Sequence, residues 1–342
     1  MKVNGRAQDH KNMLWLQSGG CGGCTLSLIC AEAPDFVTAI GSAGINILWH
    51  PTLSEETGNG FLDILRAILS GEIKLDILCL EGSVIQGPDG TGRFHVLSGF
   101  GQPMMQVISS LAILSEYVVA IGSCAAYGGI TAAGDNHVEA TGLTFDARQP
   151  GGLLGADFRA SSGLPVVNIS GCPVHPGWVT ETLFQIASDQ FQSSDMDSFG
   201  RPKAIANHLV HHGCSRNEYY EFKASAENLS DLGCMMEHLG CKGTQACADC
   251  NIRAWNGTGS CITGGYPCIA CTEPGFEEPG HTFVETPKIG GIPVGLPIDM
   301  PKAWYVALAS LSKAATPRRL KENAVADHIC LSPAQGRGDN KK

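Results

Sequence analysis

Cysteine and histidine side chains gather in one stretch of the chain, between residues 211 and 271. It holds eight cysteines and the adjacent pair His211 and His212, and glycine, proline, asparagine and threonine are frequent between them. Thiolates and imidazoles are common protein ligands of zinc and of iron–sulfur clusters, and this composition is typical of loops. The stretch therefore predicts loops wrapped around an inorganic centre.

Zinc is the simpler alternative for this stretch. CADC at 247–250 and CIAC at 268–271 each hold two cysteines separated by two residues, a spacing that suits a zinc ribbon. The choice between zinc and iron–sulfur chemistry depends on where the remaining cysteines lie, and the first part of the chain must position those.

Short apolar runs alternate with helical patterns over residues 1–198. We expect strands in the runs 13–17, 45–50, 75–83, 117–129 and 164–178, of which the last three end at Glu81, Cys124 and Cys172. Helices are expected at 25–33, 61–71, 104–116 and 179–191. Such alternation predicts an α/β domain with a flavodoxin-like, doubly wound parallel sheet.

Four cysteines follow strands of this expected sheet. Cys21 and Cys24 lie in the loop after the first strand, and Cys124 and Cys172 end two later strands. Functional residues of a doubly wound sheet collect beyond the carboxyl ends of its strands, so these cysteines should meet at one edge. Four thiolates arriving from three loops are the ligand set of one cubane cluster, which favours iron–sulfur chemistry over zinc.

The alternation of strands and helices stops at FGRPK, residues 199–203. We therefore expect three parts. The flavodoxin-like domain covers 1–198, a smaller and loop-rich iron–sulfur domain covers 199–315, and a polar tail covers 316–342.

Charge and hydropathy exclude other classes of protein. The 342 residues carry a net charge of −10 and no basic run, so no nucleic-acid partner is expected. The start of the chain has neither an apolar signal core nor a twin-arginine pair, and no apolar run reaches the roughly 18 residues of a transmembrane segment. The chain is therefore expected in the cytoplasm, with its 15 cysteines reduced.

Several motifs together carry a family resemblance. They are LWLQSGGCGGC, LEGS at 80–83, GSCAAYGG, GCPVHP, HHGC and PCIACTEPGFEE. In order, spacing and surroundings they resemble the small, electron-transferring subunit of nickel–iron hydrogenases, over residues 13–315. The resemblance implies a large-subunit partner that holds the nickel–iron centre, in a heterodimer or a dimer of heterodimers.

The resemblance also implies three iron–sulfur clusters that carry electrons away from hydrogen oxidation. A proximal 4Fe-4S cluster lies nearest the nickel–iron centre, a medial cluster follows, and a distal 4Fe-4S cluster has one histidine ligand. The implied ligands are Cys21, Cys24, Cys124 and Cys172 (proximal), Cys250, Cys268 and Cys271 (medial), and His211, Cys214, Cys234 and Cys241 (distal).

A fourth medial ligand is expected at Cys261. Periplasmic enzymes of the family carry a proline at the matching place and a 3Fe-4S cluster, whereas a cysteine adds a thiolate and a fourth iron. We therefore expect a medial 4Fe-4S cluster of lower potential, with 3Fe-4S as the alternative if Cys261 does not bind. Cys234 and Cys241 stand one residue farther apart than in the periplasmic enzymes, so a replacement for Cys234 stays open.

Some residues carry two interpretations. Glu81 ends a strand at the edge of the proximal cysteines, where it is either a proton relay or an acid that orients the backbone. The spacing HxxC favours His211 over His212 as the distal ligand. Cys247 lies in CADC without a matching role, so it is either a spectator or a replacement for Cys250.

Within the family, the chain resembles the cytoplasmic group that holds the hydrogen-sensing regulatory hydrogenases, in part through DLGCMMEHLGC at 231–241. That group implies signalling to a histidine kinase. The alternative is an uptake enzyme that feeds a quinone or a soluble carrier. Gly23 and Gly129 stand where oxygen-tolerant members carry two extra cysteines, so that route to oxygen tolerance is not expected.

Overall fold

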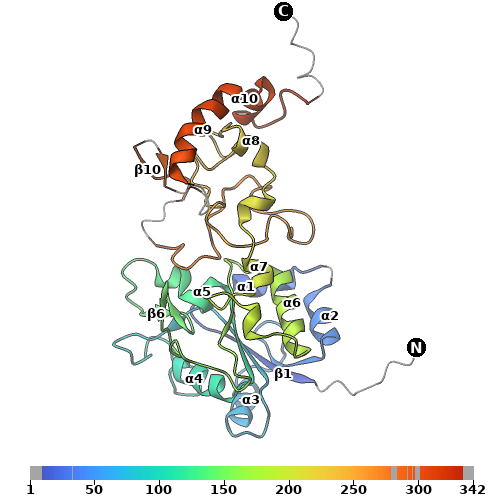
Figure 1. Cartoon of the computed structure of the whole chain (residues 1–342). Coiled ribbons are helices and arrows are strands. Elements are labelled where there is room, and N and C mark those ends of the chain that lie inside the picture. Colours follow the sequence, from blue (N-terminus) through green and yellow to red (C-terminus); the bar gives the residue numbers. More distant parts are fainter. Residues whose placement is uncertain are drawn as a thin grey trace, which may run out of the picture. The chain divides into compact units, whose positions relative to one another are not determined.

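The computed structural model describes residues 10–32, 34–278, 283–290, 292–294, 296 and 301–333. The chain divides into two compact units (Figure 1). The first unit is Met1–Ala204 with Cys271–Glu278, and the second is Ile205–Ala270 with Pro279–Lys342. The chain therefore returns to the first unit for one short segment, whereas the sequence analysis assigned an uninterrupted range to each domain.

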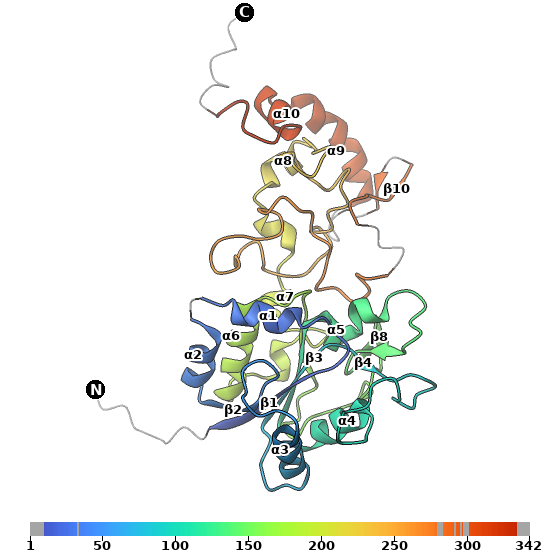
Figure 2. The same cartoon turned by 180° about the vertical axis from the view of Figure 1, so that it is seen from behind.

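Five parallel strands form the centre of the first unit (Figures 1 and 2). They are β1 (Lys11–Gln17), β2 (Ile45–Trp49), β3 (Ile77–Glu81), β5 (Tyr117–Ile121) and β9 (Val167–Ile169). Their order across the sheet is β2-β1-β3-β5-β9, and every neighbouring pair is parallel. This is the strand order of flavodoxin-like sheets, so the predicted fold class is confirmed.

Helices cover both faces of the sheet, which is why its strands read as continuous apolar runs. On one face, α3 (Asn59–Leu69) and α4 (Met104–Leu114) pack in a single core with alternate residues of β1, β3 and β5. On the other, α2 (Phe36–Ser42) and α1 (Gly23–Ile29) contact α6 (Pro176–Ala187). The four helices expected from the sequence are present, whereas α2 was not expected.

The fourth expected strand ends earlier than the sequence indicated. β5 ends at Ile121, and the short helix α5 (Gly122–Tyr127) begins at once, so Cys124 lies inside a helix and not at the end of a strand. Further short elements complete the unit: the pairs β4 (Val84–Ile85) with β6 (Ala140–Thr141) and β7 (Phe145–Asp146) with β8 (Gln149–Pro150), and the 3₁₀ turns Gly129–Ala132 and Ser193–Asp195.

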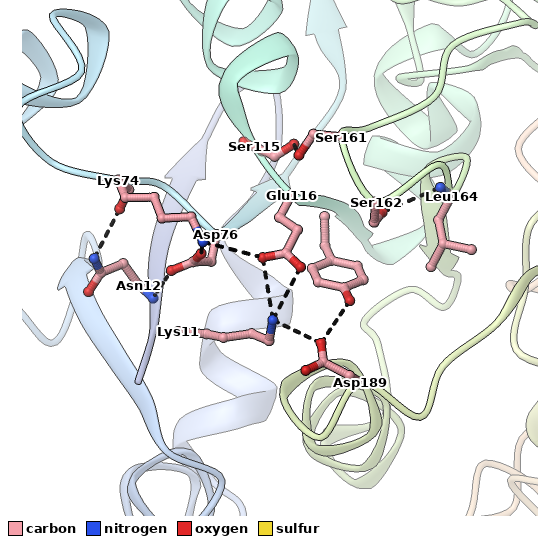
Figure 3. A network of polar contacts seen from close by, with 11 residues as sticks. Lys11, Asn12, Lys74, Asp76, Ser115, Glu116, Ser161, Ser162, Leu164 and Asp189 are labelled. Atoms are coloured by element: carbon pink, nitrogen blue, oxygen red, sulfur yellow. Dashed lines mark hydrogen bonds and ion pairs between the residues drawn. The ribbon is translucent and has the colours of Figure 1, made fainter. Parts of the chain in front are cut away.

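Ion pairs hold the amino-terminal edge of the sheet (Figure 3). Lys11, the first residue of β1, places its Nζ 2.9 Å from Asp189 and 3.3 Å from Glu116, the residue before β5. The Tyr117 hydroxyl donates to the same Asp189 carboxylate at 3.0 Å. Asp76, just before β3, pairs with a lysine at 2.6 Å. These contacts lie at the edge opposite to the one that carries the cysteines.

The second unit is built mainly from turns and loops. Its described elements are the 3₁₀ turn Val210–Gly213, α8 (Asn217–Glu221), the pair β10 (Lys288–Ile289) and β11 (Ile292–Pro293), α9 (Lys302–Ala315) and α10 (Arg318–Ala324), while α7 (Lys203–Ala206) spans the boundary between the units. α10 lies in the stretch assigned to a polar tail, and it buries Leu320 and Ala324 against Ala224. Among the residues that the structure describes, no helix combines the length and the apolar character needed to cross a membrane.

Candidate iron–sulfur sites

Cys21, Cys24, Cys124 and Cys172 come together at the carboxyl edge of the sheet. The loop after β1 and the first turn of α1 supply the first two, α5 supplies the third, and the loop after β9 supplies the last. Burial, followed by the charges of Cys124, Cys271 and Cys21, raises the pKa of Cys172 to about 12. Buried thiols that repel one another in this way ionise when a metal centre supplies the compensating positive charge.

A glycine makes room for the sulfur of Cys24. A Cβ on Gly122 would lie 2.5 Å from Cys24 Sγ, and Gly122 has a φ of +83°, which disfavours any side chain. Gly129 does the same for Cys124, since its Cβ would lie 2.8 Å from Cys124 Sγ. Four sulfur donors gathered at one edge of the sheet are the ligand set of a cubane cluster.

Gly23 also lies at this site. Its Cβ would stand 3.1 Å from the Sγ of Cys21. Gly23 and Gly129 therefore each adjoin one of these four cysteines.

Glu81 is a buried carboxylate at the end of β3, with 3% of its surface exposed. It accepts hydrogen bonds from Trp15 Nε1 at 3.2 Å, from Gln17 Nε2 at 3.0 Å and from the Thr25 backbone N–H at 3.0 Å. The Thr25 hydroxyl donates a further, short hydrogen bond. This set of donors fixes the residue that follows Cys24, which favours the backbone-orienting interpretation of Glu81 over the proton relay.

The segment Cys271–Glu278 is fastened to the first unit by polar contacts that the sequence analysis missed. The Ser123 hydroxyl donates a short hydrogen bond to the Cys271 carbonyl. Arg201 is only 6% exposed, and its guanidinium pairs with both Glu273 and Asp197 at 2.8 Å. Arg201 belongs to the FGRPK motif that indicated a linker, and nothing in that motif distinguishes a linker from an anchoring arginine.

His211, Cys214, Cys234 and Cys241 line one cavity of the second unit. All four carry the donor atoms expected of the distal cluster, whereas His212 is exposed and is not among the residues that line the cavity. The remaining walls are mainly apolar and include Val210, Met235, Met236 and Ile262. One nitrogen and three sulfur donors around a mainly apolar cavity fit a 4Fe-4S cluster with a histidine ligand.

Charges and N–H groups act on the thiols that line this cavity. Burial raises the pKa of Cys234 to about 12, and the charges of Cys241 and Cys214 add to that effect while Lys223 opposes it. The backbone N–H of Arg216 points to Cys214 Sγ at 3.4 Å.

The Arg216 guanidinium also supports the cavity. It donates to the carbonyls of Asp231 and Gly233 at 2.6 Å and 2.7 Å. It therefore holds the chain that leads into Cys234, the distal residue whose spacing differs from that of the periplasmic enzymes.

The expected medial ligands are only partly brought together. Cys250 and Cys261 are neighbours in the second unit, where burial and then the charge of Cys261 raise the pKa of Cys250 to about 12. Cys268 accepts the Ala270 backbone N–H on its sulfur at 3.4 Å. Cys271 is counted with the first unit, so the complete medial set stays a prediction.

Cys247, the other cysteine of the CADC motif, forms an isolated β-bridge with Leu209. It is not among the residues that line the distal cavity. Across the described ranges, no three His, Cys, Asp or Glu side chains converge closely enough to hold one metal ion. A cubane distributes its ligands over four irons, so its thiolates stand farther apart than the ligands of a single ion.

Two family models match the two parts of the chain, and curated relatives span both parts. Residues 21–186 match the family of the NADH ubiquinone oxidoreductase 20 kDa subunit, and residues 207–284 match the C-terminal family of NiFe and NiFeSe hydrogenase small subunits. The F420 non-reducing hydrogenase II small subunit of Methanosarcina mazei is 33% identical over 337 residues, which cover 91% of this chain and 84% of the relative. The periplasmic [NiFeSe] hydrogenase small subunit of Desulfomicrobium baculatum is 30% identical over 79% of this chain and 86% of its own length.

Solved structures agree with these relatives. The actinobacterial-type NiFe hydrogenase of Ralstonia eutropha H16 aligns with a TM-score of 0.73 and 29% identity, covering 92% of this chain and 93% of the other. The Ni-Fe-Se hydrogenase of Desulfomicrobium baculatum aligns with a TM-score of 0.69 and 30% identity, covering 81% of this chain and all of the other. The chain therefore belongs to the small-subunit family of nickel–iron hydrogenases and is the small-subunit component of a hydrogenase.

Proposed function

We propose that this chain relays electrons from a nickel–iron site in a large subunit through a proximal, a medial and a distal iron–sulfur cluster. An iron–sulfur cluster accepts and releases one electron at a time when it is bound. The protein positions the clusters, shields them from water and adjusts their potentials through N–H groups and charges. The proposed ligands are the twelve residues named in the sequence analysis, including Cys261.

The observation that carries this proposal is the cavity lined by His211, Cys214, Cys234 and Cys241. Its donor set matches a histidine-ligated cluster, and the cysteines of the first unit supply a second, separate set. Anaerobic preparation of the heterodimer should give about thirteen irons per small subunit, twelve for three cubanes and one for the nickel–iron site. His211→Ala should remove or alter one cluster signal in electron paramagnetic resonance, and His212→Ala should leave all signals unchanged. Equal effects of the two variants would contradict the assignment.

We propose that the medial cluster is 4Fe-4S because Cys261 adjoins Cys250. A fourth thiolate and a fourth iron should lower the potential relative to a 3Fe-4S centre. The oxidised protein should therefore lack a stoichiometric 3Fe-4S signal, and Cys261→Pro should create one. A full-occupancy 3Fe-4S signal in the unmodified protein would contradict the proposal.

We propose that the large subunit covers the carboxyl edge of the sheet. Leu26 and Ile29 on α1 are 59% and 45% exposed, next to Cys24. Apolar side chains in such positions are typical of a surface that a partner buries. Leu26→Glu should weaken assembly with the large subunit without unfolding the small subunit. Val37→Glu, at a position on α2 with the same 59% exposure, is the control.

Two physiological roles are proposed for the relay, namely uptake of hydrogen and hydrogen sensing. The similarity to a small subunit named as F420 non-reducing favours an uptake enzyme that delivers electrons to an acceptor other than F420. The motif at 231–241 favours a sensor that signals to a histidine kinase. Anaerobic pull-down from the host, with mass spectrometry, distinguishes them: a kinase beside the large subunit supports sensing, and a cytochrome or carrier reductase supports uptake. Cell fractionation tests the expected cytoplasmic location.

A further inference from the structure

Lys223 occupies a backbone position that usually belongs to glycine. It directly follows Phe222, the C-cap of α8, and its φ is +54°, in the left-handed region. Its backbone N–H donates to the carbonyl of Tyr220 at 3.1 Å, which closes the helix end. Glycine is the common residue at such a helix end because a Cβ is disfavoured there. A lysine in this conformation raises the question of what its side chain contributes.

The side chain of Lys223 places its ammonium over the rings of two tyrosines. Its Nζ is 3.8 Å from the centroid of the Tyr220 ring and 5.1 Å from that of Tyr305 on α9. Both rings are buried in an apolar cluster with Met236, against which Cys234 packs. Cation–π attraction holds the half-buried ammonium in place, where low polarity strengthens its field.

This ammonium stands beside the distal cavity on two sides. Tyr220 itself lines the cavity, and Cys241 packs against the same apolar cluster as Cys234. The Tyr220 ring that it contacts also meets the His211 imidazole, with ring centroids 4.3 Å apart. In the described part of the chain no carboxylate forms an ion pair with Lys223, whereas Lys313 is paired with Glu237 at 2.8 Å.

We propose that Lys223 is a fixed positive charge that raises the midpoint potential of the distal cluster. Reduction adds one negative charge to the cluster, and a cation held nearby in a region of low polarity stabilises the reduced state more than the oxidised state. A higher midpoint potential of the distal cluster draws electrons toward that cluster, which favours hydrogen oxidation over proton reduction. It also means that only acceptors of still higher potential can take these electrons. The inference rests on the proposed distal cluster and adds a residue that binds no iron.

The test is a redox titration of the anaerobic heterodimer followed by electron paramagnetic resonance. The distal signal is identified as the one that His211→Cys alters. Lys223→Met should lower the midpoint potential of that signal and leave the other clusters unchanged, and Lys223→Arg should restore most of the potential. Lys321→Gln removes an exposed lysine from α10 and serves as the control for overall charge.

A glycine variant separates the electrostatic role from a structural one. Lys223→Gly relieves the left-handed backbone and removes the charge, so it should lower the distal potential while the protein unfolds no more readily than the unmodified chain. An unchanged distal potential in both the methionine and the glycine variants, with the cluster present, would overturn the inference. If no signal of the unmodified protein changes when His211 is substituted, the distal cluster itself is overturned. This outcome is separate from the one for Lys223.

Discussion

The Cβ that Gly122 lacks would lie 2.5 Å from the sulfur of Cys24. The two residues come from different strand–helix junctions, Gly122 at the start of α5 after β5 and Cys24 in α1 after β1. Their short separation shows that the carboxyl edge of the sheet is tightly packed around the proximal cysteines. It also provides the most direct way to disturb that site without changing a proposed ligand.

Gly122→Ala should abolish the proximal cluster. The new methyl group collides with Cys24 Sγ, and the φ of +83° adds backbone strain. Iron content should fall by about a third, as expected for the loss of one cubane of three. Gly101→Ala is the matched control, because Gly101 has a φ of +71° with nothing within 4 Å of its Cβ. The control should lose about 1 kcal/mol of stability and no iron. Equal iron content in both variants would contradict the prediction.

Glu81→Gln should destabilise the first unit. Both carboxylate oxygens accept from buried donors of Trp15, Gln17 and Thr25, and an amide would turn an N–H₂ group toward some of them. Leaving these donors unsatisfied should cost about 2 kcal/mol of unfolding free energy. Anaerobic urea unfolding followed by tryptophan fluorescence measures the change. Glu55→Gln, at an exposed position, should have no effect, and an equally stable Glu81→Gln variant would show that the hydrogen bonds are dispensable.

His50 should make stability depend on pH in the mildly acidic range. Its ring is 1% exposed, packs 5.0 Å from the Trp15 ring and accepts the Thr52 N–H on Nδ1. Burial lowers the pKa of His50 to about 4, against a charge effect of Glu81 in the other direction. The unfolded chain, with a histidine pKa near 6.5, therefore binds the proton more readily than the folded chain.

Stability from His50 is therefore complete above pH 6.5 and falls as the pH drops toward 4, by at most roughly 3 kcal/mol. Urea midpoints measured at intervals across this range should show the decline. His50→Gln should be less stable at pH 8 but should lack this part of the pH dependence. Parallel pH profiles of the two proteins would rule out the effect.

Lys11→Met should weaken the amino-terminal edge of the sheet without affecting iron content. Lys11 is the main cause of the lowered pKa of Asp189. Their attraction therefore stabilises the fold above the ordinary aspartate pKa of about 4, and this stabilisation is lost as the pH falls below that value. Asp189 is largely exposed, so the expected loss is about 1 kcal/mol at low salt.

High salt should reduce the Lys11 effect because it screens exposed charges. Arg66→Gln, which breaks the solvent-exposed pair of Arg66 with Asp63, should cost less than Lys11→Met under the same conditions. Loss of iron from Lys11→Met would mean that the two edges of the sheet are coupled, contrary to expectation.

The sequence was sufficient for the sheet and for the cysteines that follow it, because apolar runs of strand length recur with helical patterns between them. It did not mark the end of β5. The run YVVAIGSCAAYGG contains no charged residue and no proline, so no strong breaker shows where Ile121 ends the strand and the left-handed Gly122 begins α5. The helix α2 does have a signal in the sequence, since Asp35 caps it by accepting the Thr38 N–H at 2.9 Å.

Two other features of the site had weaker signals. RRLKENA reads as a polar tail, yet Leu320 and Ala324 lie four residues apart and give α10 its buried side. The role of Lys223 depends on a positive φ and on two tyrosines that are distant in sequence, so neither composition nor spacing reveals it. Motifs thus indicate which residues bind an inorganic centre, whereas the surrounding charges require the folded chain.

The segment Cys271–Glu278 has a consequence for how the protein is made. It belongs to the first unit, but a ribosome completes it only after the whole of Ile205–Ala270 has been synthesised. Until then, Ser123 lacks the Cys271 carbonyl and Arg201 lacks Glu273, although Asp197 is already present. A nascent chain that has just emerged as far as Ala204 is therefore still unfinished at the edge that carries the proximal cysteines. We therefore expect the proposed proximal cluster to be inserted late in translation or after release.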